Sequence, residues 1–190
     1  MRLVYLAASA AAAALLAACA SDPNMAASSA GDAGTMASAA APAAMPRTAS
    51  AYATQAALSD LYEITSGQLA QSKGTSDHVK QLGATMVQHH TQTSQTLKAT
   101  LPQAGVNVTP PTSLDARRAA MIAELQNASG ADFDAKFLAQ QKMAHQEALA
   151  LHSTYAADGD NPALKQVAAS ATPVIKQHIA MLQGGTHAGH

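Results

Sequence analysis

The sequence predicts an all-α protein whose main domain is a four-helix bundle with a long connection between its second and third helices. Aromatic residues make up 3% of the chain, tryptophan is absent and alanine dominates. This composition suits closely packed helices better than sheets, which favour β-branched and aromatic side chains. From about residue 48 onward, apolar residues recur at spacings of three, four and seven, the period of an α-helix.

The first two long helices are separated by a short turn. The first is expected from residue 48 to residue 72, and Gly74 is the residue that breaks it. The second begins at the capping cluster Thr75-Ser76-Asp77 and is expected to stop before Pro102. Its apolar face consists of Val79, Leu82, Met86, Val87, His90, Leu97 and Leu101.

A long connection follows and leads to the second pair of helices. Residues 103–112 contain one glycine and two prolines and predict a loop, and a short helix is expected over 113–127. The third long helix is expected over 132–156. The turn Gly159-Asp160-Asn161-Pro162 then supplies a cap and a first-turn proline for a fourth helix ending near 183. Two short turns and one long connection indicate a bundle with a crossover that contains a short extra helix.

The N-terminus predicts export and lipid anchoring. Arg2 precedes an apolar run over 3–18 without an ionised residue, which is typical of a signal peptide and short for a membrane span. The run ends in Leu16-Ala17-Ala18-Cys19, which resembles the lipobox of bacterial lipoproteins. We therefore expect residues 1–18 to be removed and Cys19 to be acylated. The alternative is an ordinary secretory signal with an incidental thiol. In lipoproteins, Ala20 after the cysteine implies sorting to the outer membrane, with the domain facing the periplasm.

Two flanking segments lack a helical period. Residues 19–47 are rich in Ala, Ser, Gly and Pro and predict a flexible tether; the methionines in it, Met25, Met36 and Met45, suggest copper capture only weakly. The bundle domain is expected over 48–183. The tail over 184–190 is expected to be disordered, and its two histidines could bind stray metal.

Composition excludes several classes of function. Net charge is −1 and charged residues make up 12%, so there is no basic surface for nucleic acid. The only cysteine is Cys19, so the exported domain is held by its core without a disulfide. We find no nucleophile elbow, phosphate-binding loop or glycosidase carboxylate pair, and therefore do not expect an enzyme.

Three histidines stand among the apolar positions of three different helices: His90, His145 and His178. If the helices are in register, these imidazoles converge near the middle of the bundle, where the first helix offers Glu63, with Asp60 one turn earlier. Three imidazoles and a carboxylate suit one ion of Zn, Fe, Mn or Cu.

The neighbouring polar residues leave alternatives open. Glu63 shares a helical face with small residues, so either that face packs closely and buries the carboxylate, or Glu63 is solvated. His152 lies two turns beyond His145 and is an accessory ligand candidate, as is Asp60. His78 and His89 are expected at the surface, the latter because it is rotated by about 100° from His90.

A set of motifs extends from about residue 51 to 182. They are Asp60-x-x-Glu63-Ile64, Leu69-Ala70, Val79-Lys80, Met86-Val87-x-x-His90-Thr91, Gly130-x-x-Phe133-Asp134, His145-Gln146 and Pro173-x-x-x-x-His178. Together they resemble the ferritin-like exported bacterial family catalogued as domain of unknown function 4142. The resemblance implies a ferritin-like four-helix bundle with Glu63, His90, His145 and His178 at the family's polar positions, and no known activity. One departure is His89, where the family pattern has Asp, so a carboxylate that orients His90 is either missing or supplied by another part of the chain.

Two classes of function remain. The favoured one is a structural or stress-related envelope protein with another envelope protein as its candidate partner. In this class the Glu/His cluster is a hydrogen-bonded network that specifies helix register. The alternative is a module that uses the cluster to bind a metal or a small ligand. A ferroxidase is disfavoured because a carboxylate-bridged di-iron site needs Glu-x-x-His motifs, which the sequence lacks.

Overall fold

The computed structural model describes residues 45–184; the predicted signal peptide, Cys19, the tether as far as residue 44 and the two histidines of the tail lie outside the described residues. The described part is all-helical and contains α1 (Ala49–Lys73), α2 (Asp77–Gln103), α3 (Ala116–Asn127), α4 (Gly130–Asp158) and α5 (Pro162–Gly184). The four long helices form the predicted bundle, and α3 is the predicted short helix within the long connection.

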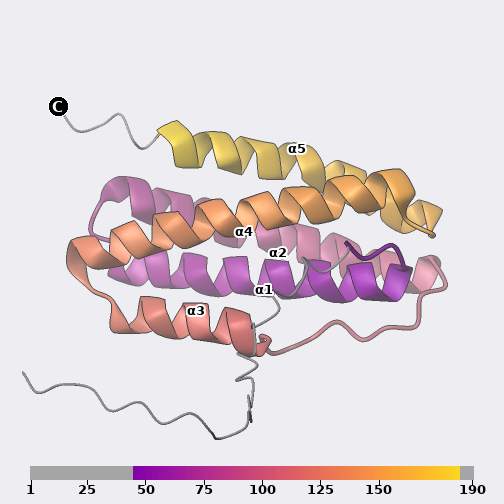
Figure 1. Cartoon of the computed structure of the whole chain (residues 1–190), viewed down its shortest axis with the longest axis horizontal. Helices are drawn as coiled ribbons and strands as arrows, with labels where there is room; N and C mark the ends of the chain where they lie inside the picture. Colours follow the sequence, from indigo (N-terminus) through magenta and orange to yellow (C-terminus); the bar gives the residue numbers. More distant parts are fainter. Residues whose placement is uncertain (1–44, 185–190) are drawn as a thin grey trace, which may run out of the picture. The chain divides into compact units, whose positions relative to one another are not determined.

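The bundle is made of two helical hairpins. The first pairs α1 with α2 and the second pairs α4 with α5, while α1 also contacts α4 and α2 contacts α5. The connection after α2 runs back along the bundle to α3, so that α2 and α4 point in the same direction (Figure 1). Each long helix therefore has two long neighbours, and side chains from all four can meet in the interior.

Polar side chains fix the two short turns. Ser76 caps α2 by accepting a hydrogen bond at Oγ from the backbone N–H of Val79 (3.3 Å). Asp134 of α4 accepts hydrogen bonds from the backbone N–H groups of Thr75 and Ser76, both at 2.9 Å, which ties this turn to the second hairpin. Before α5, Asn161 Oδ1 accepts from the N–H of Leu164 (3.2 Å), as the expected cap requires.

The end of α2 differs from the prediction, because the helix continues through Pro102 to Gln103. It is closed instead by Gly105, which has a φ of 68°. The N–H of Gly105 bonds to the carbonyl of Pro102 and the N–H of Val106 to that of Leu101, which is the hydrogen-bond pattern of a Schellman motif. A left-handed glycine, rather than the proline, therefore sets the boundary.

The short helix and the third long helix also begin at other residues than expected. α3 starts at Ala116 rather than at residue 113, because Asp115 is its cap and accepts from the N–H of Arg118 (2.8 Å). α4 starts two residues earlier than expected, at Gly130, and ends two residues later, at Asp158. Hydrophobic spacing locates a helix well but does not identify which polar residue caps it.

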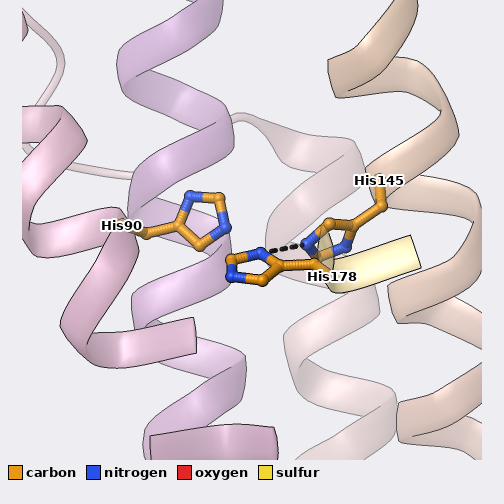
Figure 2. A group of neighbouring side chains, drawn as sticks. All are labelled: His90, His145 and His178. Atoms are coloured by element: carbon orange, nitrogen blue, oxygen red, sulfur yellow. Dashed lines mark hydrogen bonds between the residues drawn. The ribbon is translucent and has the colours of Figure 1, made fainter. Parts of the chain in front are cut away.

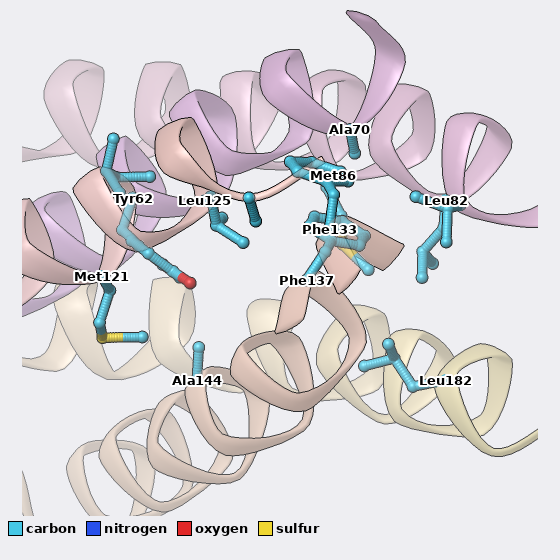
Figure 3. Packing of buried hydrophobic residues seen from close by; sticks show 13 residues of the cluster. Tyr62, Ala70, Leu82, Met86, Met121, Leu125, Phe133, Phe137, Ala144 and Leu182 are labelled. Atoms are coloured by element: carbon cyan, nitrogen blue, oxygen red, sulfur yellow. The ribbon is translucent and has the colours of Figure 1, made fainter. Parts of the chain in front are cut away.

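Two large apolar clusters fill the interior. The first, shown in Figure 3, includes Tyr62, Leu82, Met86, Leu125, Phe133, Phe137 and Leu182. The second includes Tyr52, Leu97, Leu101, Leu151, Tyr155 and Leu164. His90 lies between the two clusters along α2, and His145 lies between them along α4. The bundle thus contains a polar layer enclosed on both sides by apolar core.

Candidate metal centre

Three histidine side chains meet in this polar layer. His90 comes from α2, His145 from α4 and His178 from α5, and one nitrogen of each ring lies within 4.8 Å of the others. All three side chains are buried. Figure 2 shows the rings turned toward one another from three separate helices. The predicted convergence of the three histidines is confirmed.

Close contact between α1 and α2 brings two carboxylates beside these rings. A Cβ atom added at Gly67 of α1 would lie 2.7 Å from the carbonyl oxygen of Gly83 in α2, so neither position has room for a side chain. Asp60 and Glu63 share this small-residue face with Gly67 and are 5% and 1% exposed. The first alternative for Glu63 is therefore correct: the face packs closely and buries the carboxylate.

The ring nitrogens of His90 and His145 that point away from the cluster are hydrogen-bonded to other groups. His90 donates from Nδ1 to Asp60 Oδ1 (2.9 Å), and Thr93 donates from Oγ1 to the same oxygen (2.8 Å). His145 donates from Nδ1 to the backbone carbonyl of Gln141 (2.9 Å). The carboxylate that orients His90 is thus Asp60 of α1, while position 89, where the family pattern has Asp, is a histidine in this chain.

The hydrogen bonds determine which nitrogens carry protons. Because a carbonyl can only accept, His145 has its proton on Nδ1, and Nε2 of the neutral ring is an acceptor. His145 Nε2 lies 3.1 Å from His178 Nδ1, which must then be the donor. His178 Nε2 in turn accepts from His89 Nδ1 at 2.8 Å. The carbonyl of Gln141 thereby sets the direction of a hydrogen-bond chain through three imidazoles.

His89 is not at the surface, contrary to the expectation from the sequence. It is half-buried, and its ring stacks on that of His178 with centroids 5.1 Å apart. The reason is that α2 contacts both α1 and α5, so two consecutive residues can face different neighbours. His78 is half-buried as well, and its Nε2 has no hydrogen-bond partner in the structure.

Several buried polar atoms near the cluster have no hydrogen-bond partner. Within residues 45–184 they are His90 Nε2, Glu63 Oε1, Glu63 Oε2 and Gln141 Oε1. Glu63 Oε1 lies 3.7 Å from His145 Nδ1, which is close enough for charge interaction and too far for a hydrogen bond. Leaving a buried donor or acceptor unsatisfied costs free energy, and water or an ion bound between these groups would relieve that cost.

Burial and charge set the protonation of the rings. Burial lowers the pKa of His178 to about 3, with the nearby His90, His145 and His89 adding to the effect. Burial likewise lowers the pKa of His145. For His90, burial acts in the same direction, but the hydrogen bond to Asp60 and the charge of Glu63 outweigh it and raise the pKa. His145 and His178 are therefore neutral at pH 7, the form in which imidazole binds metal.

His152, predicted as an accessory ligand, has a different partner. Its Nδ1 lies 3.0 Å from the hydroxyl of Tyr52, and the ring belongs to none of the histidine contacts described above. Burial lowers its pKa to about 4. The accessory candidates thus separate: Asp60 bonds directly to a histidine of the cluster, whereas His152 stands in a second polar position nearer the Tyr52 end of the bundle.

Comparison with known proteins gives one result for the whole domain. Residues 34–184 match the family described as Domain of unknown function (DUF4142), a range that contains all five helices. No curated protein and no solved structure matched the chain. Since the match extends over most of the sequence and agrees with the motifs and the helical bundle, the chain belongs to the DUF4142 family.

Proposed function

We propose that the protein binds one divalent transition-metal ion among His90, His145 and His178, with Glu63 as the neighbouring carboxylate. The observation that carries the proposal is the set of unpartnered atoms: His90 Nε2 and both Glu63 oxygens are buried beside the three rings without a hydrogen bond. An ion bound there would take His90 Nε2 as a ligand, and its positive charge would offset the buried charge of Glu63.

The hydrogen bonds suggest which atoms bind. His90 and His145 would use Nε2, since Nδ1 of each already donates to Asp60 or to a backbone carbonyl. His178 would use Nδ1 after its proton moves to Nε2, from where it can donate to His89. Metal-binding histidines usually donate their second N–H to a carboxylate or carbonyl, so this arrangement supports an ion site.

The donor types limit the choice of ion. Imidazole nitrogen and carboxylate oxygen suit Zn, Cu, Fe or Mn, and the charges of Glu63 and Asp60 offset that of a divalent cation in a buried site. Glu63 would have to move its side chain to become the fourth ligand, because its Oε1 lies 3.7 Å from His145 Nδ1, the nitrogen that faces the Gln141 carbonyl. The family description assigns no activity, and we propose retention of the ion rather than catalysis.

The structural or stress-related role remains the second candidate. The hydrogen-bond chain from His89 through His178 and His145 to the Gln141 carbonyl links α2, α5 and α4, and such a network can specify helix register. This role accounts for the bonded nitrogens. It does not account for the unpartnered Glu63 carboxylate, which is why we now favour metal binding over it.

We further propose that acylated Cys19 anchors the domain to the outer membrane, on the periplasmic side, where an envelope protein is the expected partner. The support is the signal-like N-terminus and the single cysteine. Among residues 45–184, no helix is both long enough and apolar enough to cross a bilayer. In this proposal the acyl chains on Cys19 connect the domain to the membrane.

Elemental analysis of the full-length protein tests metal binding. The protein should be purified in mild detergent without an affinity tag and with His187→Ala and His190→Ala, so that the tail cannot contribute metal. We expect about one ion per chain, lost in His145→Ala and retained in His78→Ala, the control at a half-buried histidine outside the cluster. Chelator should lower the melting temperature, and the ion should restore it by an amount that grows with the logarithm of ion concentration over Kd.

A wild-type protein that contains no metal, and whose melting temperature ignores chelator and added Zn, Cu, Fe and Mn, would contradict the proposal. In that case destabilisation of His145→Ala would favour the structural network. Glu63→Gln separates the two functions further. The glutamine keeps the size of the side chain and removes its charge, so it should weaken binding of a divalent ion but can add hydrogen bonds to a purely structural network.

A further inference from the structure

A cavity opens beside the histidine cluster between α2 and α5. It has a volume of about 190 Å³, room for several water molecules. Gln92 and Thr96 of α2 and Ser170 of α5 form its exposed rim, and Val174 is half-buried at its side. The cavity therefore connects solvent with the interior of the bundle.

Buried polar side chains form the inner wall of this cavity. Asp60 and His152 both line it and are only 5% and 7% exposed. The two hydrogen bonds that Asp60 accepts from side chains, from His90 and Thr93, both use Oδ1, which leaves Oδ2 for another partner. Tyr52 holds Nδ1 of His152, which leaves Nε2 as the second free group.

Within residues 45–184, large buried side chains lie between the cluster and each end of the bundle. On one side Phe133 and Phe137 are fully buried, and on the other Tyr52, Tyr155 and Leu164 are fully buried. Tyr52 and Tyr155 are also stacked, with centroids 3.9 Å apart. The cavity reaches Asp60, whose Oδ1 is bonded to His90, so it ends one hydrogen bond away from a ring of the cluster.

We propose that this cavity is the access route for a divalent metal ion, and that Asp60 Oδ2 and His152 Nε2 receive the ion before the three histidines bind it. The inference rests on the proposed metal function. A carboxylate and a neutral imidazole are suitable transient ligands, because two donors replace part of the water shell without completing a closed site. Exposed Gln92, Thr96 and Ser170 keep the mouth hydrated.

The rate of metal uptake tests the route. The metal-free full-length protein, with the tail histidines replaced as above, is mixed with Co²⁺ in a stopped-flow spectrometer, and the absorption of bound Co²⁺ is followed. Val174→Phe should fill the cavity and slow uptake at least tenfold, with the final occupancy unchanged. His152→Leu should slow it at least threefold. Leu149→Phe, half-buried on α4 outside the cavity, is the matched control and should bind at the wild-type rate.

The outcomes separate the route from the function. If the wild-type protein takes up no Co²⁺, Zn²⁺, Cu²⁺, Fe²⁺ or Mn²⁺, both proposals are overturned. If it binds an ion and the rates of Val174→Phe and His152→Leu equal that of the wild type, only the route is overturned. Circular dichroism shows whether the Val174→Phe protein folds. If it does not fold, the uptake rate of His152→Leu is the deciding measurement, and a rate equal to that of the wild type overturns the route.

Discussion

Replacing Gly83 by alanine tests the close contact that brings the two carboxylates of α1 to the histidines. The added Cβ would lie 2.7 Å from the Cβ of Ala70 and 2.7 Å from the carbonyl oxygen of Gly67. Carbon atoms in contact normally stand about 3.5 to 4.0 Å apart. Since one obstacle is backbone and the other a Cβ, neither can rotate away, and α1 and α2 must separate.

The expected loss of stability follows from two opposing effects. Overpacking of a core costs about 1 to 3 kcal/mol, and the rigid neighbours here place Gly83→Ala near the upper value. Alanine in a helix recovers about 1 kcal/mol relative to glycine. The net destabilisation should be about 2 kcal/mol, which for a domain of this size lowers the melting temperature by about 4 to 8 °C.

Urea and thermal unfolding followed by circular dichroism give both quantities. Gly184→Ala, at the end of α5 where an added Cβ meets nothing within 4 Å, is the control and should change little. In the double variant Gly67→Ala/Gly83→Ala, the loss of stability should be smaller than the sum of the two single losses, because one substitution already separates the helices. A Gly83→Ala protein as stable as the wild type would refute the close contact and, with it, our explanation for the burial of Glu63.

Four further predictions concern single groups. His152 has a pKa of about 4 in the folded state and 6.5 in the unfolded chain, so between these pH values it is protonated in the unfolded chain and neutral in the folded protein. Lowering the pH to 4.5 should therefore reduce the free energy of unfolding by about 2 to 3 kcal/mol through this group. Urea titrations of His152→Leu should lack that loss. Asp60→Asn should weaken metal affinity about 10- to 100-fold in a chelator competition, because an amide orients His90 less firmly than a carboxylate does. An unchanged affinity would argue against a role of Asp60 in orienting His90. Ser76→Ala removes a helix cap and should cost about 1 kcal/mol in urea unfolding. Gly105→Ala places a side chain at a φ of 68° and should cost about 1 to 2 kcal/mol in the same assay, whereas a neutral effect would contradict the left-handed helix end.

Local signals were sufficient to predict the helices. Apolar spacing, the cap at Ser76 and the cap at Asn161 act within one or two turns, so the sequence carries them directly. Pro102 misled the prediction because the Schellman end at Gly105 depends on backbone torsion, which hydrophobic spacing does not reveal. The three clustered histidines were predictable because each interrupts an apolar face.

The remaining parts of the site depend on geometry between helices. A helical wheel places Glu63 on a face but does not tell how closely the next helix approaches, so its burial stayed open until the Gly67 contact was known. His89 was misplaced for the same reason. The partner of His145 is a backbone carbonyl in its own helix, and that of His90 is a carboxylate in another. No residue spacing within one helix indicates such a choice.

The two-hairpin construction has a consequence for how the chain folds. The bonds Asp60–His90 and His145–His178 each close within one hairpin, over 30 and 33 residues, whereas His89–His178 joins the hairpins over 89. Contacts distant in sequence form after nearby ones because more chain entropy must be lost first. We therefore expect the imidazoles and carboxylates to remain hydrated until the two hairpins dock. The polar layer is then dehydrated in the last step of folding.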